Sequence, residues 1–313
     1  MDFFEIFKQV LILYIIMSIG MLVYRLKIVN DETLSRLSKF MLHVTIPATI
    51  LTGLSSSGEL TRTDFYQMVI LTAISNIFVI ALSFLILRVF FIKKEERPFY
   101  RYITIFGNVG FIGYPMIMII IGTESLLLGA VANIFYSVLL YTLGIYLMSQ
   151  YSDEENHGGF QWRRLISPGI IVAILSIVFF FMGVRLPTVL EETANMLGNV
   201  TSPMAMIVLG ASINKINFKA IIKNYRIILI SIVKMVVYPI SFAYILRLLG
   251  FSGMPAMVAV VLMGMPIATT TVITAMEFNK KNLVKASEAS VFSTLLLIVT
   301  IPVLIYSVSI IGG

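Results

Sequence analysis

The chain has 313 residues, of which 58% are hydrophobic and only 12% are charged. Ordinary soluble domains are about 45–50% apolar and about 25% charged, so this composition excludes a soluble globular protein and indicates one that crosses a membrane several times. The net charge of +7 comes from short basic clusters between apolar runs, a pattern that reflects membrane topology and argues against nucleic-acid binding. Since there is no cysteine, disulfides, thiol chemistry and a cysteine metal site are excluded.

Apolar stretches of about twenty residues, the length that crosses a bilayer as a helix, recur along the whole chain. The first follows Met1-Asp2-Phe3-Phe4-Glu5, which lacks the basic segment of a cleaved signal peptide, so we expect it to stay as an anchor. We predict ten transmembrane helices, at about residues 5–24, 37–55, 65–91, 101–121, 125–149, 166–183, 193–212, 226–249, 255–276 and 288–311.

The basic residues between these helices are divided unevenly between the two sides. Eighteen of the 23 Lys and Arg residues fall on the side that carries Arg25, Lys93 and Arg164, whereas four fall on the other side. Loops rich in Lys and Arg stay in the cytoplasm, so the asymmetry predicts a multi-pass plasma-membrane protein with both termini outside the cytoplasm. The one remaining basic residue, Lys234, lies inside a predicted helix.

Two of the predicted helices contain polar, glycine-broken stretches with a proline. These are Gly107-Asn108-Val109-Gly110-Phe111-Ile112-Gly113-Tyr114-Pro115 in the fourth helix and Gly264-Met265-Pro266-Ile267-Ala268-Thr269-Thr270-Thr271 in the ninth. Proline removes a backbone donor and displaces the carbonyl four residues earlier, and lipid cannot satisfy the freed groups. We predict full helix breaks at Pro115 and Pro266, each supported by protein or by a polar cavity, with an ordinary proline kink as the alternative.

The two halves of the chain match at an offset of about 150 to 160 residues. The matched pairs are Val44-Thr45-Ile46-Pro47 with Val200-Thr201-Ser202-Pro203, Pro115 with Pro266, and Tyr24-Arg25-Leu26 with Val184-Arg185-Leu186. Five helices per unit would invert the second unit relative to the first, and paired breaks in inverted repeats are typical of a transporter's substrate site. We therefore predict a first repeat at 1–152, a short cytoplasmic linker at 153–164 and a second repeat at 165–313.

The Gly-Asn-x-Gly-Phe-x-Gly-x-Pro run that ends at Pro115 resembles the first crossover of the auxin efflux carrier family, which contains the plant PIN-FORMED carriers and bacterial permeases assigned malate or malonate. Further runs that fit this family are Met265-Pro266-Ile267-Ala268, Glu277-Phe278-Asn279 and Thr300-Ile301-Pro302. The resemblance covers the whole chain and implies an all-α polytopic fold, with ten transmembrane helices as a 5+5 inverted repeat, like that of bile-acid sodium symporters and the antiporter NhaA.

The same resemblance implies a scaffold and a transport domain, with helices four and nine crossing near the bilayer centre, and transport of organic anions without ATP. The short linker differs from the long hydrophilic loop of the plant members. It argues against plant-style regulation and against auxin itself as the substrate.

The predicted substrate site lies where the two breaks meet. Asn108 carries an amide in an otherwise apolar helix, and freed backbone amides and helix N-termini beside it favour a carboxylate. The alternatives are a structural amide at Asn108, close helix packing at the glycines and hydrogen bonds to the preceding turn at the threonines. The candidate substrate-binding residues are Asn108, Gly110, Gly113, Tyr114, Pro115, Pro266, Ile267, Thr269 and Thr270.

Lys234 lies roughly 12 Å from the cytoplasmic end of its helix, at about 1.5 Å per residue. A buried ammonium in a membrane needs a partner, so Lys234 either balances the substrate's charge, occupies the place of a coupling cation or snorkels to the surface. Asn76 falls near the corresponding place in the first repeat and is predicted to give polar support. We expect no cofactor and no metal, and coupling to protons or sodium stays open because no acidic residue lies deep in a predicted helix.

The combined pattern favours a secondary transporter that moves a small organic anion, a carboxylate such as malate or malonate or an auxin-like acid, by alternating access. A channel or a receptor-like sensor built on a transporter fold is the alternative, although two inverted breaks favour one occluded site over a ring-lined pore. An enzyme is disfavoured because the predicted helices contain no His/Glu cluster, aspartate pair or Gly-x-Ser-x-Gly elbow. The expected partners are the anion, the lipid bilayer and, through the apolar outer helices, a second copy in a homodimer.

Overall fold

The computed structural model describes residues 3–152, 166–214 and 224–312. Within these ranges every regular element is a helix, apart from one isolated β-bridge. Six helical runs of this part are long and apolar enough to cross a membrane, and four shorter apolar helices accompany them. The prediction of an all-helical, multi-pass protein is therefore confirmed, whereas the linker predicted at 153–164 lies outside the described residues.

The first half of the chain begins with a long helix and continues with the runs predicted as the second to fifth spans. Its α-helices are α1 (Phe3–Arg25), α2 (Asp31–Phe40), α3 (Ile46–Ser55), α4 (Arg62–Val89), α5 (Arg97–Ile105), α6 (Tyr114–Ile120), α7 (Leu126–Leu139) and α8 (Ile145–Ser149). Short π or 3-10 turns connect some of them, at Met41–Thr45, Ser57–Glu59, Val109–Gly113, Thr123–Ser125 and Leu140–Gly144.

The second half of the chain also consists of helical runs, one of which is interrupted. Its α-helices are α9 (Pro168–Met182), α10 (Thr188–Asn199), α11 (Thr201–Ile213), α13 (Tyr225–Ile232), α14 (Tyr238–Leu248), α15 (Met254–Met263), α16 (Thr270–Phe278) and α17 (Leu283–Gly312). A π turn covers Val233–Val237 and a 3-10 turn covers Lys280–Asn282.

Prolines shift the helical hydrogen-bond pattern in this protein without ending the run. Pro47, Pro115 and Pro239 each stand at the second position of a helix, directly after a π turn. Because proline donates no N–H, the hydrogen bonds before it shift from the i→i−4 pattern to the i→i−5 pattern. The Ile46 N–H, for example, donates to the Met41 carbonyl. A proline alone therefore does not interrupt a helix in this chain.

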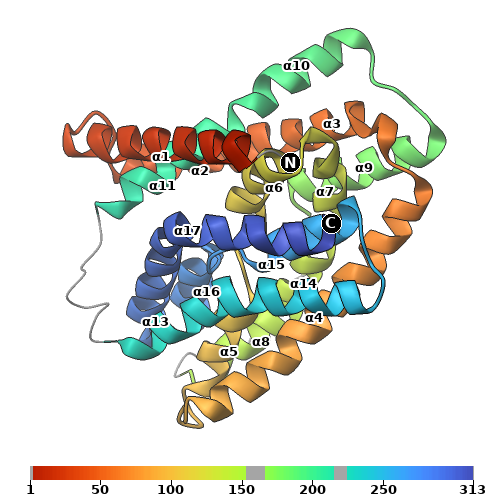
Figure 1. Cartoon of the computed structure of the whole chain (residues 1–313). Helices are drawn as coiled ribbons and strands as arrows, with labels where there is room; N and C mark the ends of the chain where they lie inside the picture. Colours follow the sequence, from red (N-terminus) through yellow and green to blue (C-terminus); the bar gives the residue numbers. More distant parts are fainter. Residues whose placement is uncertain (1–2, 153–165, 215–223, 313) are drawn as a thin grey trace.

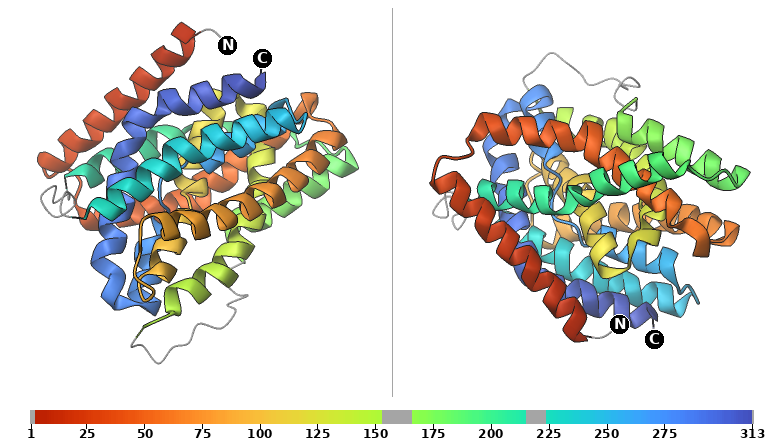
Figure 2. Two further views of the ribbon diagram at one scale, coloured as in Figure 1. Left: turned by 60° about the horizontal axis from the view of Figure 1, so that its bottom comes forward. Right: turned by 90° about the horizontal axis from the view of Figure 1, so that it is seen from above.

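The helices form two groups, which can be followed in Figures 1 and 2. In the first group α1 packs on α11, and α3 packs on α9 and α10. In the second group α17 packs on α13 to α16, and α4 packs on α5 and α15. Helix α7 joins them, since it contacts α4 on one side and α3 and α9 on the other. The start of α1 and the end of α17 lie near each other in all views.

Close backbone packing against α11 and a hydrogen bond to α17 help to hold α1 in place. A Cβ added at Gly210 of α11 would lie 1.9 Å from the Met17 carbonyl oxygen, so only glycine allows this approach of α1 to α11. Pro302 lies inside α17 and leaves the Ile298 carbonyl without its helical donor. The Tyr14 hydroxyl of α1 donates to that carbonyl and so connects the two groups.

Candidate functional site

The two interrupted runs cross each other in the second group of helices. Helix α5 ends at Ile105 and α15 ends at Met263, and the segments that follow are extended. Gly107 and Ile267 face each other in an antiparallel bridge. The Asn108 N–H donates to the Pro266 carbonyl at 2.7 Å, and the Ala268 N–H donates to the Phe106 carbonyl at 3.3 Å. Each break therefore supplies backbone partners for the other.

A glycine without a side chain, a proline without an N–H and a serine of α17 allow the two backbones to cross at close range. A Cβ at Gly107 would lie 3.3 Å from the Met265 carbonyl oxygen, so glycine allows the two backbones to approach. Pro266 has no N–H that would need a partner at the crossing. The Ile267 N–H donates to the Ser293 Oγ at 2.9 Å, and the Ser293 hydroxyl lies fully buried. Sequence reasoning missed Ser293, although its neighbours Ser290 and Thr294 form a polar stretch in an apolar helix.

The sequence predicted the first break at Pro115, but the break lies earlier in the chain. The chain leaves the helix after Ile105, and Pro115 is the second residue of α6. It follows the π turn Val109–Gly113 within the helical run Val109–Ile120, so the shifted hydrogen-bond pattern accommodates the missing N–H. Gly110 and Gly113 belong to the π turn between the extended segment and α6. In the second run, by contrast, Pro266 lies within the extended segment itself.

Asn108 lies at the crossing with half of its amide in use. The side chain is 4% exposed, and its Oδ1 accepts the Phe111 N–H at 3.1 Å, which caps the π turn. The Nδ2 group is buried and has no hydrogen-bond partner. A Cβ added at nearby Gly110 would meet no atom within 4 Å, so there is open space next to the turn. Two amide N–H donors are therefore available at the crossing.

Some of the other predicted substrate-binding residues lie at the crossing, and the rest lie next to it. Pro266 and Ile267 are buried and take part in the backbone contacts, whereas Thr269 is exposed. The Thr270 Oγ1 is buried and without a partner, so it does not bond back to the preceding turn. Gly113 and Tyr114 lie buried after the break, and a Cβ at Gly113 would lie 2.8 Å from the Leu262 side chain. Gly113 therefore serves close packing.

Lys234 meets the end of α5. Its side chain is 2% exposed, and the Nζ donates to the carbonyls of Thr104 at 2.9 Å and Ile105 at 3.3 Å. These carbonyls belong to the last turn of α5, where no helical donor follows and the helix dipole places partial negative charge. The ammonium therefore caps the broken helix, and Lys234 does not snorkel to the membrane surface.

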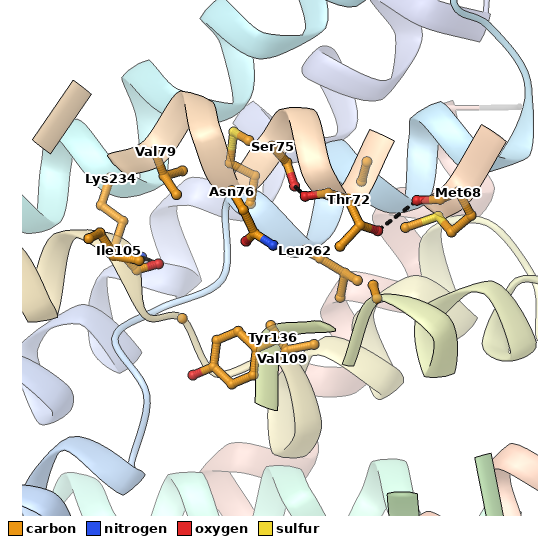
Figure 3. A pocket seen from close by; sticks show the side chains of 14 residues that line it. Met68, Thr72, Ser75, Asn76, Val79, Ile105, Val109, Tyr136, Lys234 and Leu262 are labelled. Atoms are coloured by element: carbon orange, nitrogen blue, oxygen red, sulfur yellow. Dashed lines mark hydrogen bonds between the residues drawn. The ribbon is translucent and has the colours of Figure 1, made fainter. Parts of the chain in front are cut away.

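A small polar pocket lies between the crossing and α4, and Figure 3 shows it from close by. Its polar lining comes from Thr72, Ser75, Asn76, Tyr136 and Lys234. The Asn76 amide points from α4 into the pocket, with Lys234 beside it and Tyr136 across from it. The cavity volume is about 60 Å³, which is room for a few water molecules.

This pocket brings together the two residues predicted as accessory, and it adds Tyr136, whose buried hydroxyl has no partner and which the sequence did not single out. The side chains of Asn108, Thr269 and Thr270 do not line it. Among the described residues, no group of three His, Asp or Glu side chains could hold a metal ion.

Comparison with known proteins gives matches along almost the whole chain. Residues 5–305 match the family model described as membrane transport protein. An uncharacterized transporter of Methanocaldococcus jannaschii is 24% identical over 269 residues, which cover 84% of this chain and 86% of the relative. An uncharacterized transporter of Methanothermobacter thermautotrophicus is 26% identical over 300 residues, which cover 94% of this chain and 96% of the relative. Both breaks lie within the range that the family model matches.

The serine that supports the crossing gives a test of its geometry. Ser293→Ala leaves the buried Ile267 N–H without an acceptor, so the free energy of unfolding should fall by about 1–3 kcal/mol. The measurement is the melting temperature of the purified protein in detergent. Ser307→Ala is the control, because Ser307 is equally buried in α17 but bonds only to the Val303 carbonyl of its own helix. Equal melting temperatures of the two variants would contradict the crossing contact.

Proposed function

Because the chain belongs to the membrane transport protein family, the family of the auxin efflux carriers, we propose that it is a secondary transporter of a small organic anion. The observation that carries this proposal is the buried Asn108 amide, which has unused donors at the crossing of two broken helices. A carboxylate only accepts hydrogen bonds, so it is the natural partner of such a group. A carboxylate such as malate or malonate is the substrate class we propose.

The surroundings of Asn108 suit the same ligand. The helical run Val109–Ile120 and helix α16 both begin at the crossing, and the start of a helix carries partial positive charge. Gly110 leaves space beside the turn, and the Thr270 hydroxyl has no partner within the protein. In this proposal the substrate carboxylate accepts from the Asn108 Nδ2 and lies against the Gly110 backbone. Thr269 and Thr270 contact the rest of the molecule.

In its protonated form, Lys234 supplies a positive charge close to this site. The end of a helix dipole is worth about half an elementary charge, so the α5 terminus offsets only part of the ammonium. No residue that lines the adjoining pocket is acidic. We propose that Lys234 occupies the place that a coupling cation would fill, and that the substrate anion offsets the remaining charge. On this basis, transport requires no bound sodium at the end of α5.

The proposed architecture is ten spans in two inverted five-helix units, 1–152 and 165–313. The corresponding breaks and the adjacent chain ends support it. The two helix groups then act as scaffold and transport domain in the plasma membrane. The group that contains the crossing moves against the group that contains α1, and each position opens the site to one side. Tyr14 of α1 and α7 lie where the groups meet, so they are placed to guide this motion.

The substrate class can be identified by thermal shift. Purified protein is screened against mono- and dicarboxylates, since a ligand that binds the folded state raises its melting temperature. The strongest ligand is then used for transport in proteoliposomes. Asn108→Ala should abolish this transport while expression and folding stay normal, because the variant removes the donors proposed to hold the carboxylate.

A matched control comes from α10. The Asn195 Oδ1 is also buried and without a partner, but it lies far from the crossing in the sequence and in the fold. Asn195→Ala should therefore retain transport. Wild-type transport by Asn108→Ala would refute the assigned site, whereas loss of transport in both variants would point to a general effect of removing a buried amide.

Lys234→Gln tests the role of this positive charge. Removal of one positive charge should weaken the apparent affinity for the anion about tenfold or more and change the charge moved per transport cycle. Both are measured as currents of proteoliposomes on a solid-supported membrane. Lys93→Gln, in the exposed connection between α4 and α5, should leave them unchanged. Currents and affinity equal to wild type in Lys234→Gln would refute the electrostatic role.

The basic residues give a separate test of topology. Alkaline phosphatase, which is active only outside the cytoplasm, should be active when it is fused after Gly313. Green fluorescent protein at the same position should stay dark when it is exported by the same route. The physical reason is the excess of Lys and Arg on the opposite side of the membrane. If the fluorescent-protein fusion fluoresces and the phosphatase fusion is inactive, the C-terminus is cytoplasmic and the proposed orientation is wrong.

A further inference from the structure

Three arginines gather in a hollow where α4 ends and α5 begins. The hollow has a volume of about 440 Å³ and is lined by Arg88, Arg97 and Arg101, with Ala81, Phe84 and Leu85 of α4 as its apolar wall. Arg88 lies in the last turn of α4, and Arg97 is the first residue of α5. Neither the crossing nor the pocket beside Lys234 includes any of these residues.

Arg97 and Arg101 are oriented by contacts that leave most of their donors free. The Arg97 Nε donates to the Ile92 carbonyl at 3.0 Å. The Arg101 guanidinium lies over the Phe84 ring, with its Cζ 3.8 Å from the ring centroid. Its Nε is buried and has no hydrogen-bond partner. A buried donor on a charged group without an acceptor is costly, and a ligand oxygen would satisfy it.

The three charges also lack a counter-charge. Among the described residues, no carboxylate forms an ion pair with Arg88, Arg97 or Arg101. The neighbouring Glu96 is already engaged, by Arg226 at 3.0 Å and by Lys285 at 2.6 Å. Guanidinium groups that share one hollow repel each other, and an anion with several oxygens removes this repulsion. Arginine forks fit phosphate oxygens in a bidentate manner, so phosphate is the preferred anion.

The apolar wall of the hollow favours a phospholipid over a soluble phosphate. Phe84 and Leu85 are 56% and 57% exposed, on a helix apolar enough to cross a membrane. Such a surface faces lipid chains, while the arginines lie at the end of the helix, at the level of the headgroups. A soluble phosphate would leave this apolar wall unused. A phospholipid would place its phosphate among the arginines and its acyl chains along α4.

We propose that this hollow binds the headgroup of an anionic phospholipid. Basic pockets between helices at the membrane surface recognise such headgroups, and an anionic lipid contributes the net negative charge that the arginines lack. The bound lipid would join the end of α4 to the start of α5, the helix whose far end forms the crossing. This inference rests on the protein's place in a membrane and is independent of the identity of the transported substrate.

The test measures lipid affinity and leaves transport aside. Purified protein in a neutral detergent is titrated with phosphatidylglycerol, and the apparent Kd is obtained from the rise in melting temperature. Wild type should be stabilised by phosphatidylglycerol far more than by phosphatidylcholine. The triple variant Arg88→Gln, Arg97→Gln, Arg101→Gln should bind phosphatidylglycerol at least about tenfold more weakly. The double variant Lys93→Gln, Lys94→Gln removes exposed charges from the same connection and should stay within about twofold of wild type.

Two results would overturn the proposal. One is an unchanged phosphatidylglycerol affinity in the triple variant, which would show that the arginines do not hold the lipid. The other is an equal rise in melting temperature with glycerol phosphate, which would show a site for a soluble anion. If the triple variant fails to fold, Arg88→Gln alone changes an exposed side chain, and it should weaken phosphatidylglycerol binding about threefold or more. Wild-type affinity in this single variant would likewise contradict the proposal.

Discussion

The arrangement of the second helix group depends on one constraint, which is that backbone polar groups freed inside a membrane must find partners in the protein. Each unsatisfied group in hydrocarbon costs several kcal/mol. At the crossing the two breaks pair with each other, Ser293 accepts the Ile267 N–H, and Lys234 donates to the last carbonyls of α5. Neither break could exist alone, so the two halves of the chain have to fold against each other.

This constraint also couples the crossing to distant parts of the chain. Lys234 follows α13, Ser293 lies in α17, and Gly107 needs the backbone of the second break at close range. The crossing and the helices around it are therefore expected to move as one body. The contacts between the two helix groups are of another kind, because helix packing and a few side-chain hydrogen bonds, from Tyr14 and Arg62, can re-form in a second position at a modest cost. A motion between the groups is thus less costly than a motion within the crossing.

The sequence predicted the elements of this fold better than their contacts. Hydropathy located the apolar runs, and glycine, asparagine and proline identified both interrupted ones, because these features are local. The prediction placed the break at Pro115, but a π turn accommodates that proline within a helical run, and the break lies at the close approach of Gly107 to the second run. Lys234 was recognised as a buried charge, but its partners Thr104 and Ile105 lie about 130 residues earlier, and only the folded register brings them together. From the sequence, the three arginines of the hollow were recognised only among the 18 basic residues of one side of the membrane, because a charge count does not show the apolar wall beside them.

Depth in the membrane explains why basic side chains have different roles in this one protein. An ammonium at mid-membrane loses its hydration, so it is tolerated only where fixed dipoles replace water, and Lys234 has them at the end of α5. The arginines lie at the end of α4, where headgroups and water are within reach, so they keep their donors for a mobile anion. Near the crossing, the ammonium exceeds the partial charge of the helix end, and the starts of two helical segments add to the same sign. In the proposed function, this positive charge disfavours a bound cation at the crossing and is offset by the charge of the substrate anion.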